Sequence, residues 1–275
     1  MICFPNAKIN LGLRVTEKRP DGYHNLETVF YPIGLKDALE VVPHPNGKPY
    51  SLEVKTLDSN CLDMSIENNI VTKTFRRLEK QFRLQPSAFF LKKVIPAGAG
   101  LGGGSSDAAY ALKIINLINN LGLTDSEMEQ ISAQIGADCA FFIKNKPIFA
   151  SGIGTDFEDV TLNLRGLFLV LLKPNVHVST AEAFSLVHPA HPARSLKEWI
   201  GNPIETWRNN VINDFEQSVF LKYPVIGEIK EALYRNGAIY ASMSGSGSSV
   251  YGLFKSPVQL KKAFSGCFYW NETLK

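Results

Sequence analysis

Five glycines fall within seven residues of this sequence, at Gly98, Gly100, Gly102, Gly103 and Gly104. An apolar stretch precedes them and an alanine-rich stretch with helical spacing follows, so they join a predicted strand to a predicted helix. Glycine lets the backbone approach an anion closely, and a helix start offers N–H groups and the positive end of its dipole. The pattern therefore predicts a phosphate-binding loop. The competing interpretation is a flexible linker, although a linker does not normally join a strand directly to a helix.

Three common phosphate-binding motifs fit this loop poorly. Gly98, Gly100 and Gly103 formally meet the dinucleotide fingerprint, but no acidic residue lies about 20 positions further on to hold a ribose. A Walker loop needs a lysine where Gly104 stands. A protein-kinase loop needs His-Arg-Asp and Asp-Phe-Gly later in the chain, and the sequence contains neither.

Phosphoryl transfer to an alcohol also needs a group that accepts the hydroxyl proton and a cation that offsets negative charge. Asp138 is a candidate for the first role, as the one charge in an apolar stretch, but it could also be a helix N-cap. Lys8 is a candidate for the second, but it could also be an exposed residue on the polar side of a strand. The two residues are far apart in sequence, so spacing alone does not bring them together.

The segment from Pro96 to Ala109, Pro-Ala-Gly-Ala-Gly-Leu-Gly-Gly-Gly-Ser-Ser-Asp-Ala-Ala, resembles the ATP-binding signature of the GHMP kinases. Other matching segments narrow the resemblance to members whose acceptor alcohol carries a cytidine diphosphate. These segments are Pro5–Leu13, Arg19–Phe30, Gly136–Asp138, Asn213–Glu216 and Met243–Ser249. Together they extend over most of the chain, and roughly residues 185–210 carry no recognisable signature.

The resemblance implies an α+β protein with the two-domain GHMP-kinase fold. Residues 1–157 are expected to form an N-terminal α+β domain that carries the glycine loop and binds the nucleotide. Residues 158–275 are expected to form a smaller C-terminal domain of ferredoxin-like character, with the active site in the cleft between the domains.

The resemblance also implies ATP as co-substrate, accompanied by Mg²⁺, with no residue assigned as a metal ligand. Asp138 matches the catalytic base of the family and Lys8 its partner lysine. The expected reaction is direct, in-line transfer of the γ-phosphoryl group to the 2-hydroxyl of a methylerythritol unit, in the non-mevalonate route to isoprenoid precursors. The residues that match the ATP site are Pro96, Ala97, Gly98, Ala99, Gly100, Leu101, Gly102, Gly103, Gly104, Ser105 and Ser106, with Asn69 near the adenine.

For the cytidine end of the acceptor, aromatic rings can stack on a cytosine and an imidazole can bond its edge. Tyr23 and His24 match the residues of the family that contact the cytosine, although taken alone they could be an exposed turn. Phe184 is the candidate for a second stacking ring, with a core phenylalanine as the alternative, and Asn10 matches a substrate-side residue. The segment before Phe184 departs from the family pattern, since Asn175 stands where a glycine is common.

Alternation and helical spacing predict the elements that position these residues. Strands are expected at 7–15, 24–33, 38–42, 51–55, 88–95, 167–172, 238–243 and 250–254. Helices are expected at 68–82, from the glycine loop to near Gly122, at 124–135, and within 180–236 between polar, Pro-rich segments. Ser244–Ser249 is expected to be a hairpin-like loop, and the strand at 7–15 is expected to be half-buried with Lys8 and Asn10 on its polar face.

The amino-acid composition excludes several classes of protein. The 275 residues are 45% hydrophobic and 20% charged, which excludes intrinsic disorder, and the net charge of +3 does not point to nucleic acid or a membrane. Four separated cysteines and no Cys-x-x-Cys exclude a disulfide framework and a zinc ribbon. With no signal-peptide pattern and no apolar stretch long enough to span a bilayer, we expect a soluble, cytoplasmic protein, a monomer or weak homodimer.

Two other functions remain open on this sequence. One is a GHMP-family kinase of another small alcohol, and Tyr23-His24 argues against it. The other is a non-catalytic nucleotide-binding member of the fold, and the presence of both Lys8 and Asp138 argues against that.

Overall fold

The computed structural model describes residues 1–56 and 66–275, so Cys61 lies outside the described residues. Its contacts divide the chain into two compact units. Unit 1 comprises Met1–Ala7, Leu35–Ala97 and Gly102–Lys146, and unit 2 comprises Lys8–Gly34, Gly98–Leu101 and Pro147–Lys275. Both units are discontinuous, because two long strands and the glycine-rich segment carry the chain from one unit into the other. The domain boundary between residues 157 and 158 stays a prediction.

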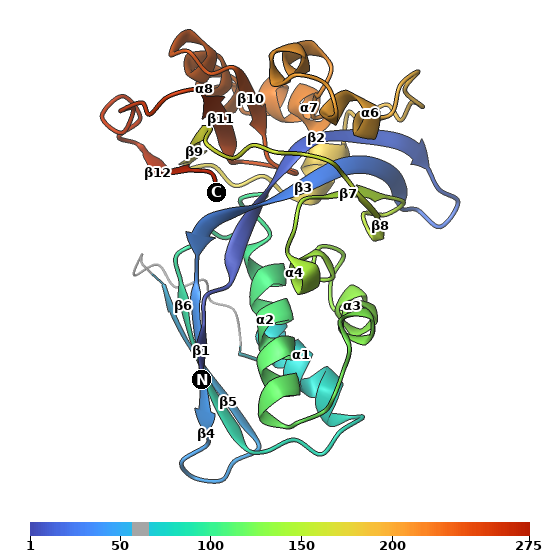
Figure 1. The fold of residues 1–275 in the computed structure, drawn as a ribbon, viewed down its shortest axis with the longest axis vertical. Helices are drawn as coiled ribbons and strands as arrows, with labels where there is room; N and C mark the ends of the chain where they lie inside the picture. The colour runs from blue at the N-terminus through green and yellow to red at the C-terminus, as the bar shows by residue number, and fades with distance from the viewer. Residues whose placement is uncertain (57–65) are drawn as a thin grey trace. The chain divides into compact units, whose positions relative to one another are not determined.

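Unit 1 combines a sheet with four α-helices. The sheet has the order β1-β4-β6-β5, in which β4 and β6 are antiparallel and β5 and β6 are parallel. Helices α1 and α2 lie side by side, and α2 packs on the sheet (Figure 1). The bounds are β1 Ile2–Cys3, β4 Ala38–Pro43, β5 Tyr50–Thr56, a 3-10 turn Ile66–Asn68, α1 Ile70–Glu79, β6 Ser87–Lys93, α2 Gly103–Ile118, α3 Asp125–Ala133 and α4 Phe141–Lys144.

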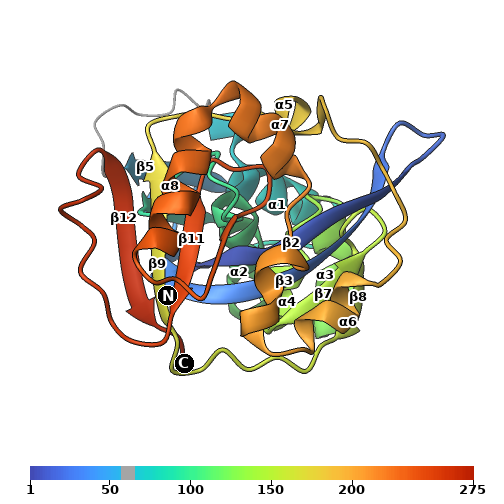
Figure 2. The same ribbon diagram turned by 90° about the horizontal axis from the view of Figure 1, so that it is seen from above.

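Unit 2 contains two further sheets, of order β2-β3-β7-β8 and β10-β11-β9-β12. The second is antiparallel throughout, and α8 packs on its strands β9, β10 and β11 (Figure 2). The bounds are β2 Asn6–Lys18, β3 His24–Lys36, β7 Ile148–Ser151, β8 Asp156–Asp159, β9 Phe168–Pro174, α5 Thr180–Phe184, α6 Leu196–Ile200, a 3-10 helix Ile204–Asn209, α7 Phe215–Lys222, α8 Pro224–Arg235, β10 Tyr240–Met243, β11 Val250–Phe254 and β12 Cys267–Thr273.

Most of the predicted elements are confirmed, with differences at their ends. Helix α3 begins with the capping box that Thr124 and Glu127 predict. Helix α1 is shorter than the predicted 68–82 at both ends. Its start is set by Asn69, whose side chain accepts a hydrogen bond from the Val71 N–H at 2.9 Å, and it ends at Glu79. Four strands lie outside the predicted set, namely β1, β7, β8 and β12. Strand β1 has only two residues, and the polar and apolar residues of the other three do not alternate regularly.

The predicted half-burial of the first strand is wrong. Every residue of β2 from Asn6 to Leu13 is buried, including Lys8 at 3% and Asn10 at 2% exposure. The alternation of polar and apolar residues is real, but the polar side is covered as well. Solvent exposure is therefore excluded for Lys8 and Asn10, which need buried hydrogen-bonding partners instead.

Three of the cysteines, Cys3, Cys139 and Cys267, are free thiols. In the described ranges 1–56 and 66–275, no helix combines the length and the apolar character needed to cross a bilayer. The same ranges contain no cluster of three or more histidine, cysteine, aspartate or glutamate side chains that could hold a metal ion.

Candidate active site

The glycine-rich segment has the backbone that its composition predicts. Gly98, Gly100 and Gly102 have φ angles of 58°, 74° and 68°, in the left-handed region that favours glycine. Gly102 is the N-cap of α2 and supplies no side-chain cap. The first N–H groups of α2 therefore lack intrahelical acceptors, which is the arrangement that binds anions at helix starts. The strand–loop–helix interpretation is confirmed, and the linker interpretation is wrong.

The apex of this segment, Gly98–Leu101, is held by other parts of unit 2. The Lys8 N–H donates to the Leu101 carbonyl at 3.0 Å, and the Ser249 N–H donates to the Ala99 carbonyl at 3.3 Å. The Ser244 hydroxyl donates to the Gly100 carbonyl at 2.8 Å. A Cβ atom on Gly100 would lie 1.9 Å from the Ser244 carbonyl oxygen. Glycine at position 100 is thus required by both the φ angle and the close approach of a second backbone segment.

Lys8 and Asn10 form a buried polar cluster beside this apex. The Lys8 ammonium donates to Asn10 Oδ1 at 2.5 Å and lies 4.9 Å from the centre of the Phe30 ring. Asn10 Nδ2 donates to the Thr28 hydroxyl at 2.9 Å, and the Asn10 N–H donates to Ser244 Oγ at 3.2 Å. These bonds orient the amide of Asn10 so that its oxygen faces the ammonium. The cluster holds a cation in a fixed place within unit 2.

Asp138 lies in the turn before α4, next to the start of α2 within unit 1. A Cβ on Gly136 would lie 3.1 Å from the Cys139 sulfur and 4.0 Å from the Ser105 hydroxyl, so this turn packs against the first turn of α2. Asp138 is not the N-cap of α4, because that position is occupied by Ala140, which makes no side-chain cap. Asp138 is half-buried in this turn.

Two further predicted residues of unit 1 lie near the start of α2. Asn69 is one of them, because a Cβ on Gly104 would lie 3.7 Å from the side chain of Ile70, the residue that follows Asn69. Asn69 is buried and caps α1, so its position relative to α2 is fixed. The Ser106 hydroxyl is buried and has no hydrogen-bond partner within the part of the chain that the structure describes. An unsatisfied hydroxyl at a helix start fits a ligand oxygen.

A buried ionic triad, which we define as Asp37, Lys93 and Asp107, anchors the start of α2. The Lys93 ammonium pairs with Asp37 and lies 2.6 Å from Asp107 Oδ2. Asp37 Oδ1 also accepts the Ile95 N–H at 2.8 Å. Burial lowers the pKa of Lys93, but Asp107 and Asp37 raise it further, so the net shift is upward. Burial raises the pKa of Asp107 to about 7, with Lys93 opposing the shift and Asp37 adding to it.

His24 and Phe184 come together in another part of unit 2, and Tyr23 precedes His24 in the chain. The imidazole of His24 stacks on the Phe184 ring with the ring centres 4.7 Å apart and the planes 25° apart. Phe184 in turn contacts Phe215 edge-on at 4.6 Å. Tyr23 follows the predicted Pro-Asp-Gly turn and is 64% exposed, an unusual position for a large aromatic ring.

Helix α5, which carries Phe184, forms in spite of the departure from the family pattern before it. Ser179 and Glu182 make a capping box at its start, with the Glu182 N–H donating to Ser179 Oγ at 3.2 Å. This cap fixes the beginning of a short helix and so the direction of the Phe184 side chain.

The structure therefore groups the predicted site residues into three sets. Lys8, Asn10 and Gly98–Leu101 form one set in unit 2. Tyr23, His24 and Phe184 form a second set in the same unit. The third set lies in unit 1 and comprises Asn69, Pro96, Ala97, Gly102–Ser106 and Asp138. Sequence reasoning missed Thr28 and the triad. Thr28 and Asp107 lie inside the matched segments Arg19–Phe30 and Pro96–Ala109, which could have indicated them, whereas no local signal marks Asp37 and Lys93. The serine–glycine segment that contains Ser244 is also visible in the sequence.

Family models match two parts of the chain. The GHMP kinases N terminal domain matches residues 69–146, and the GHMP kinases C terminal domain matches residues 193–268. A crystal structure of a homoserine kinase from Cytophaga hutchinsonii shares the fold, with a TM-score of 0.69 over 98% of this chain and 95% of that one, at 19% identity. The chain belongs to the GHMP kinase family and has its α+β fold. It is a small-molecule kinase, with ATP as the co-substrate that this family implies.

Comparison with individual proteins narrows the family. A 4-diphosphocytidyl-2-C-methyl-D-erythritol kinase of Bacteroides fragilis is 55% identical over the full length of both chains, and one of Parabacteroides distasonis is 51% identical, also over both full lengths. A crystal structure of 4-(cytidine 5'-diphospho)-2C-methyl-D-erythritol kinase matches with a TM-score of 0.77 at 27% identity, over 98% of each chain. Within the GHMP kinases, this chain belongs to the family of these enzymes.

Proposed function

We propose that this protein transfers the γ-phosphoryl group of ATP to the 2-hydroxyl of 4-diphosphocytidyl-2-C-methyl-D-erythritol. The observation that carries the choice of acceptor is the stack of His24 on Phe184, with the exposed ring of Tyr23 on the residue before His24. Such a group of rings suits a flat heterocycle with a hydrogen-bonding edge. The full-length relatives named for this substrate support the same choice.

The glycine-rich segment is proposed to bind the phosphates of ATP. The backbone N–H groups at the start of α2 and the positive end of its dipole favour negative charge there. The residues assigned to this role are Pro96, Ala97, Gly98, Ala99, Gly100, Leu101, Gly102, Gly103, Gly104, Ser105 and Ser106. The buried Ser106 hydroxyl needs a partner, which a phosphate oxygen supplies. Asn69, at the start of the neighbouring helix α1, is proposed to lie near the adenine.

Mg²⁺ is proposed to accompany the nucleotide. Magnesium prefers oxygen ligands and keeps several waters, so nucleotide phosphates and a hydroxyl suffice for its site. The Ser106 hydroxyl, buried and unsatisfied in the described chain, fits that set. Bound there, the ion would neutralise charge on the phosphates during transfer.

Asp138 is proposed to be the base and Lys8 its cationic partner. Asp138 accepts the proton of the 2-hydroxyl as its oxygen forms a bond to the γ-phosphorus and the bond to the leaving ADP breaks. The Lys8 ammonium, held by Asn10 Oδ1, stabilises the carboxylate and offsets negative charge that develops in the transition state. No phosphorylated protein intermediate is required for this direct transfer.

The acceptor is proposed to be held at its cytosine end by Tyr23, His24 and Phe184. The rings of Tyr23 and Phe184 stack on the cytosine, and the imidazole of His24 forms a hydrogen bond with the donor–acceptor edge of that base. This requires the base to displace or extend the present stack between His24 and Phe184. Asn10 is proposed to contact the acceptor near its reacting end, beside Lys8.

Three broader properties also stay proposals. The protein is proposed to act in the non-mevalonate route to isoprenoid precursors, since that is where its substrate belongs by the family resemblance. It is proposed to work in the cytoplasm, on the grounds of its separated cysteines, and as a monomer or weak homodimer.

The test of this function is ADP release with Mg·ATP and a panel of alcohols, namely 4-diphosphocytidyl-2-C-methyl-D-erythritol, mevalonate, homoserine and galactose. We expect turnover with the cytidyl substrate alone. Turnover with another member of the panel, together with a lack of protection of the protein by cytidine nucleotides, would establish a kinase of a different small alcohol. A folded protein that binds ATP but turns over none of them would support the non-catalytic alternative.

A further inference from the structure

One motif has no place in the proposed site. This motif, Asn213-Asp214-Phe215-Glu216, precedes and opens α7 in unit 2. Asn213, Phe215 and Glu216 are buried, with Asn213 at 2% and Glu216 at 8% exposure, and Asp214 is half-buried. A buried amide and a buried carboxylate are costly unless they bond to something that needs them. Their partners therefore indicate what the motif does.

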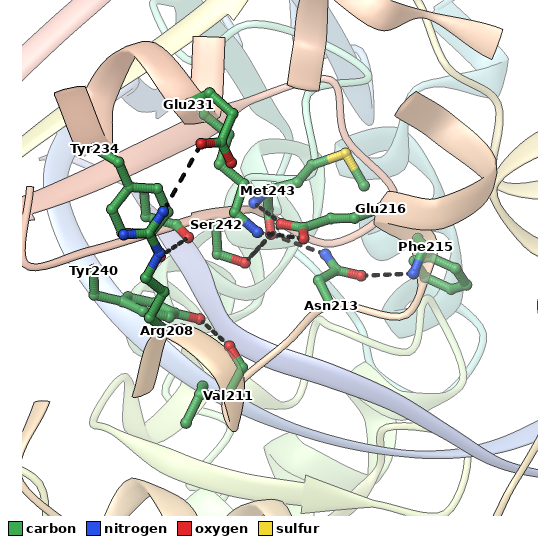
Figure 3. A network of polar contacts seen from close by, with 12 residues as sticks. Arg208, Val211, Asn213, Phe215, Glu216, Glu231, Tyr234, Tyr240, Ser242 and Met243 are labelled. Atoms are coloured by element: carbon green, nitrogen blue, oxygen red, sulfur yellow. Dashed lines mark hydrogen bonds and ion pairs between the residues drawn. The ribbon is translucent and has the colours of Figure 1, made fainter. Parts of the chain in front are cut away.

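Asn213 bonds to the turn between β10 and β11. Its Nδ2 group donates to the Met243 carbonyl at 2.9 Å and to the Gly245 carbonyl at 2.8 Å (Figure 3). Its Oδ1 accepts the Phe215 N–H at 3.0 Å. Both amide hydrogens and the amide oxygen are thus used. The two carbonyls flank Ser244, so Asn213 fixes the backbone on either side of that residue.

Glu216 bonds to the same turn from the first turn of α7. Its Oε1 accepts the Met243 N–H at 2.9 Å and the Ser242 hydroxyl at 3.2 Å (Figure 3). Its Oε2 accepts the Lys230 ammonium at 2.5 Å, so the buried charge is balanced. Asn213 and Glu216 together hold the donor and acceptor groups of Met243 and the carbonyl of Gly245.

The motif is itself fixed to the strand that carries Lys8 and Asn10. The Leu13 N–H donates to the Ile212 carbonyl at 2.9 Å, and the Asp214 N–H donates to the Leu13 carbonyl at 2.8 Å. Asp214 Oδ2 accepts the Val15 N–H at 2.8 Å. The motif therefore joins β2 to the β10–β11 turn within one compact unit.

The residue held in this way, Ser244, touches both parts of the site in unit 2. Its hydroxyl donates to the Gly100 carbonyl and accepts the Asn10 N–H, at 2.8 and 3.2 Å. Its carbonyl oxygen lies 1.9 Å from the position that a Cβ on Gly100 would occupy. A displacement of the turn would move the apex of the glycine-rich segment and release the backbone of Asn10.

We infer that Asn213 and Glu216 are positioning residues for phosphoryl transfer, which act by holding Ser244 against Gly100 and Asn10. This inference rests on the proposed function for its kinetic consequence, but its structural consequence is independent of the acceptor. Errors of about 1 Å in the placement of reacting groups can reduce turnover by about 100-fold. We therefore expect Asn213→Ala and Glu216→Ala to lower kcat by about 10- to 100-fold below the temperature at which they unfold.

A pair of variants separates positioning from stability. Glu216→Gln keeps the Oε1 acceptor for Met243 and Ser242 but loses the ion pair with Lys230. We expect it to melt at a lower temperature than the wild type but to retain kcat within about threefold, whereas Glu216→Ala loses both. Equal loss of kcat in the two variants would overturn the inference, because it would assign the effect to the ion pair.

Tyr234→Phe is the matched control. It removes a hydrogen bond of 3.1 Å to the Ala241 carbonyl, on the strand that leads to the turn, and leaves the hydrogen bonds that Asn213 and Glu216 make to Met243 and Gly245 in place. It should lower the melting temperature and leave kcat unchanged. If it lowers kcat as much as Asn213→Ala does, any destabilisation of this sheet reduces turnover and the inference is wrong.

Hydrogen–deuterium exchange tests the contact without any substrate. The N–H groups of Asn10 and Ser249 donate to Ser244 Oγ and to the Ala99 carbonyl, so they report on the turn and the apex. Asn213→Ala, or Asn213→Asp if the first variant fails to fold, should accelerate exchange at both amides, and Tyr234→Phe should not. Unchanged exchange would overturn the inference. Failure of the wild type to use the cytidyl substrate would instead overturn the proposed function.

Discussion

The apex of the glycine-rich segment, Gly98–Leu101, and the helix start that follows it, Gly103–Ser106, are held by different kinds of interaction. The apex is held by neutral hydrogen bonds from Ser244, Ser249 and the Lys8 backbone in unit 2. The helix start is held in unit 1 by the buried ionic triad, since Asp107 directly follows the first turn of α2 and a Cβ on Gly103 would meet Ile95 and Lys93. Neutral bonds tolerate changes of pH, whereas buried charges do not. We therefore expect the apex and the helix start to respond differently to substitution and to pH.

Loss of the lysine of the triad should have the largest effect on stability. Lys93→Met leaves Asp37 and Asp107 buried together without their cation. Breaking a buried ion pair in this way costs about 3–5 kcal/mol. Chemical denaturation of the protein should show a loss of this size in the free energy of unfolding. Lys55→Met, which removes an exposed ion pair with Glu53, is the control and should cost less than about 1 kcal/mol. Equal losses in both variants would contradict a structural role for the triad.

A side chain added at the apex should have a large effect on activity. Gly100→Ala places a methyl group against the Ser244 backbone at a φ of 74°, and neither can shift cheaply. We expect kcat/KM for ATP to fall by about 100-fold or more. Gly122→Ala has a similar φ of 69° but nothing within 4 Å of the added carbon, so it separates strain from collision. Activity of Gly100→Ala near that of Gly122→Ala would show that the close approach is unimportant.

The pH dependence of stability should come from the helix start rather than the apex. The Asp107 pKa is raised from 3.8 to about 7, so the folded protein holds a proton there that the unfolded chain loses near pH 4. Stability therefore falls as the pH rises from about 4 to about 7. Each unit of pKa shift corresponds to about 1.4 kcal/mol, and we expect about 2 kcal/mol after relaxation of the buried site.

Asp107→Asn removes this titration. Between about pH 5 and about pH 8, the melting temperature of the variant should rise relative to that of the wild type as the pH rises. A constant difference between variant and wild type across that range would contradict the raised pKa of Asp107.

Substitution of a residue that lies outside the glycine-rich segment should leave ATP binding unaffected. His24→Ala removes the ring that stacks on Phe184 but touches neither Ser244 nor the triad. We expect the KM for the cytidyl substrate to rise about tenfold, with the KM for ATP unchanged, because one stacking contact is worth about 1–3 kcal/mol. Initial rates at varied concentrations of each substrate measure both constants. An unchanged KM for the acceptor would exclude His24 from the site.

The local parts of this site could be predicted from the sequence. The left-handed glycines and the helix that follows them are determined by residues that are neighbours in the chain. The capping box of Thr124 and Glu127, and the turn that precedes Tyr23, are local in the same sense. Each depends on a few residues whose backbone preferences agree.

The long-range parts could not be predicted. Lys93 is 56 residues from Asp37, and Ser244 is 144 residues from Gly100, so no periodicity links them. The burial of Lys8 and Asn10 was missed for the same reason, because the partners that cover the polar side of β2 come from β3, the glycine-rich segment and the β10–β11 turn. An alternating strand predicts one polar face, but it does not show whether another segment covers that face.

The most direct test of the central claim is the turnover of Asp138→Asn with the cytidyl substrate, measured together with its affinity for ATP. We expect kcat to fall by about 1,000-fold, within the range for loss of a general base, while ATP binding stays within about threefold of the wild type. Asparagine keeps the shape of the side chain and the surrounding turn, so the change isolates the proton acceptor. Turnover within about tenfold of the wild type would contradict the assignment of Asp138 as the base.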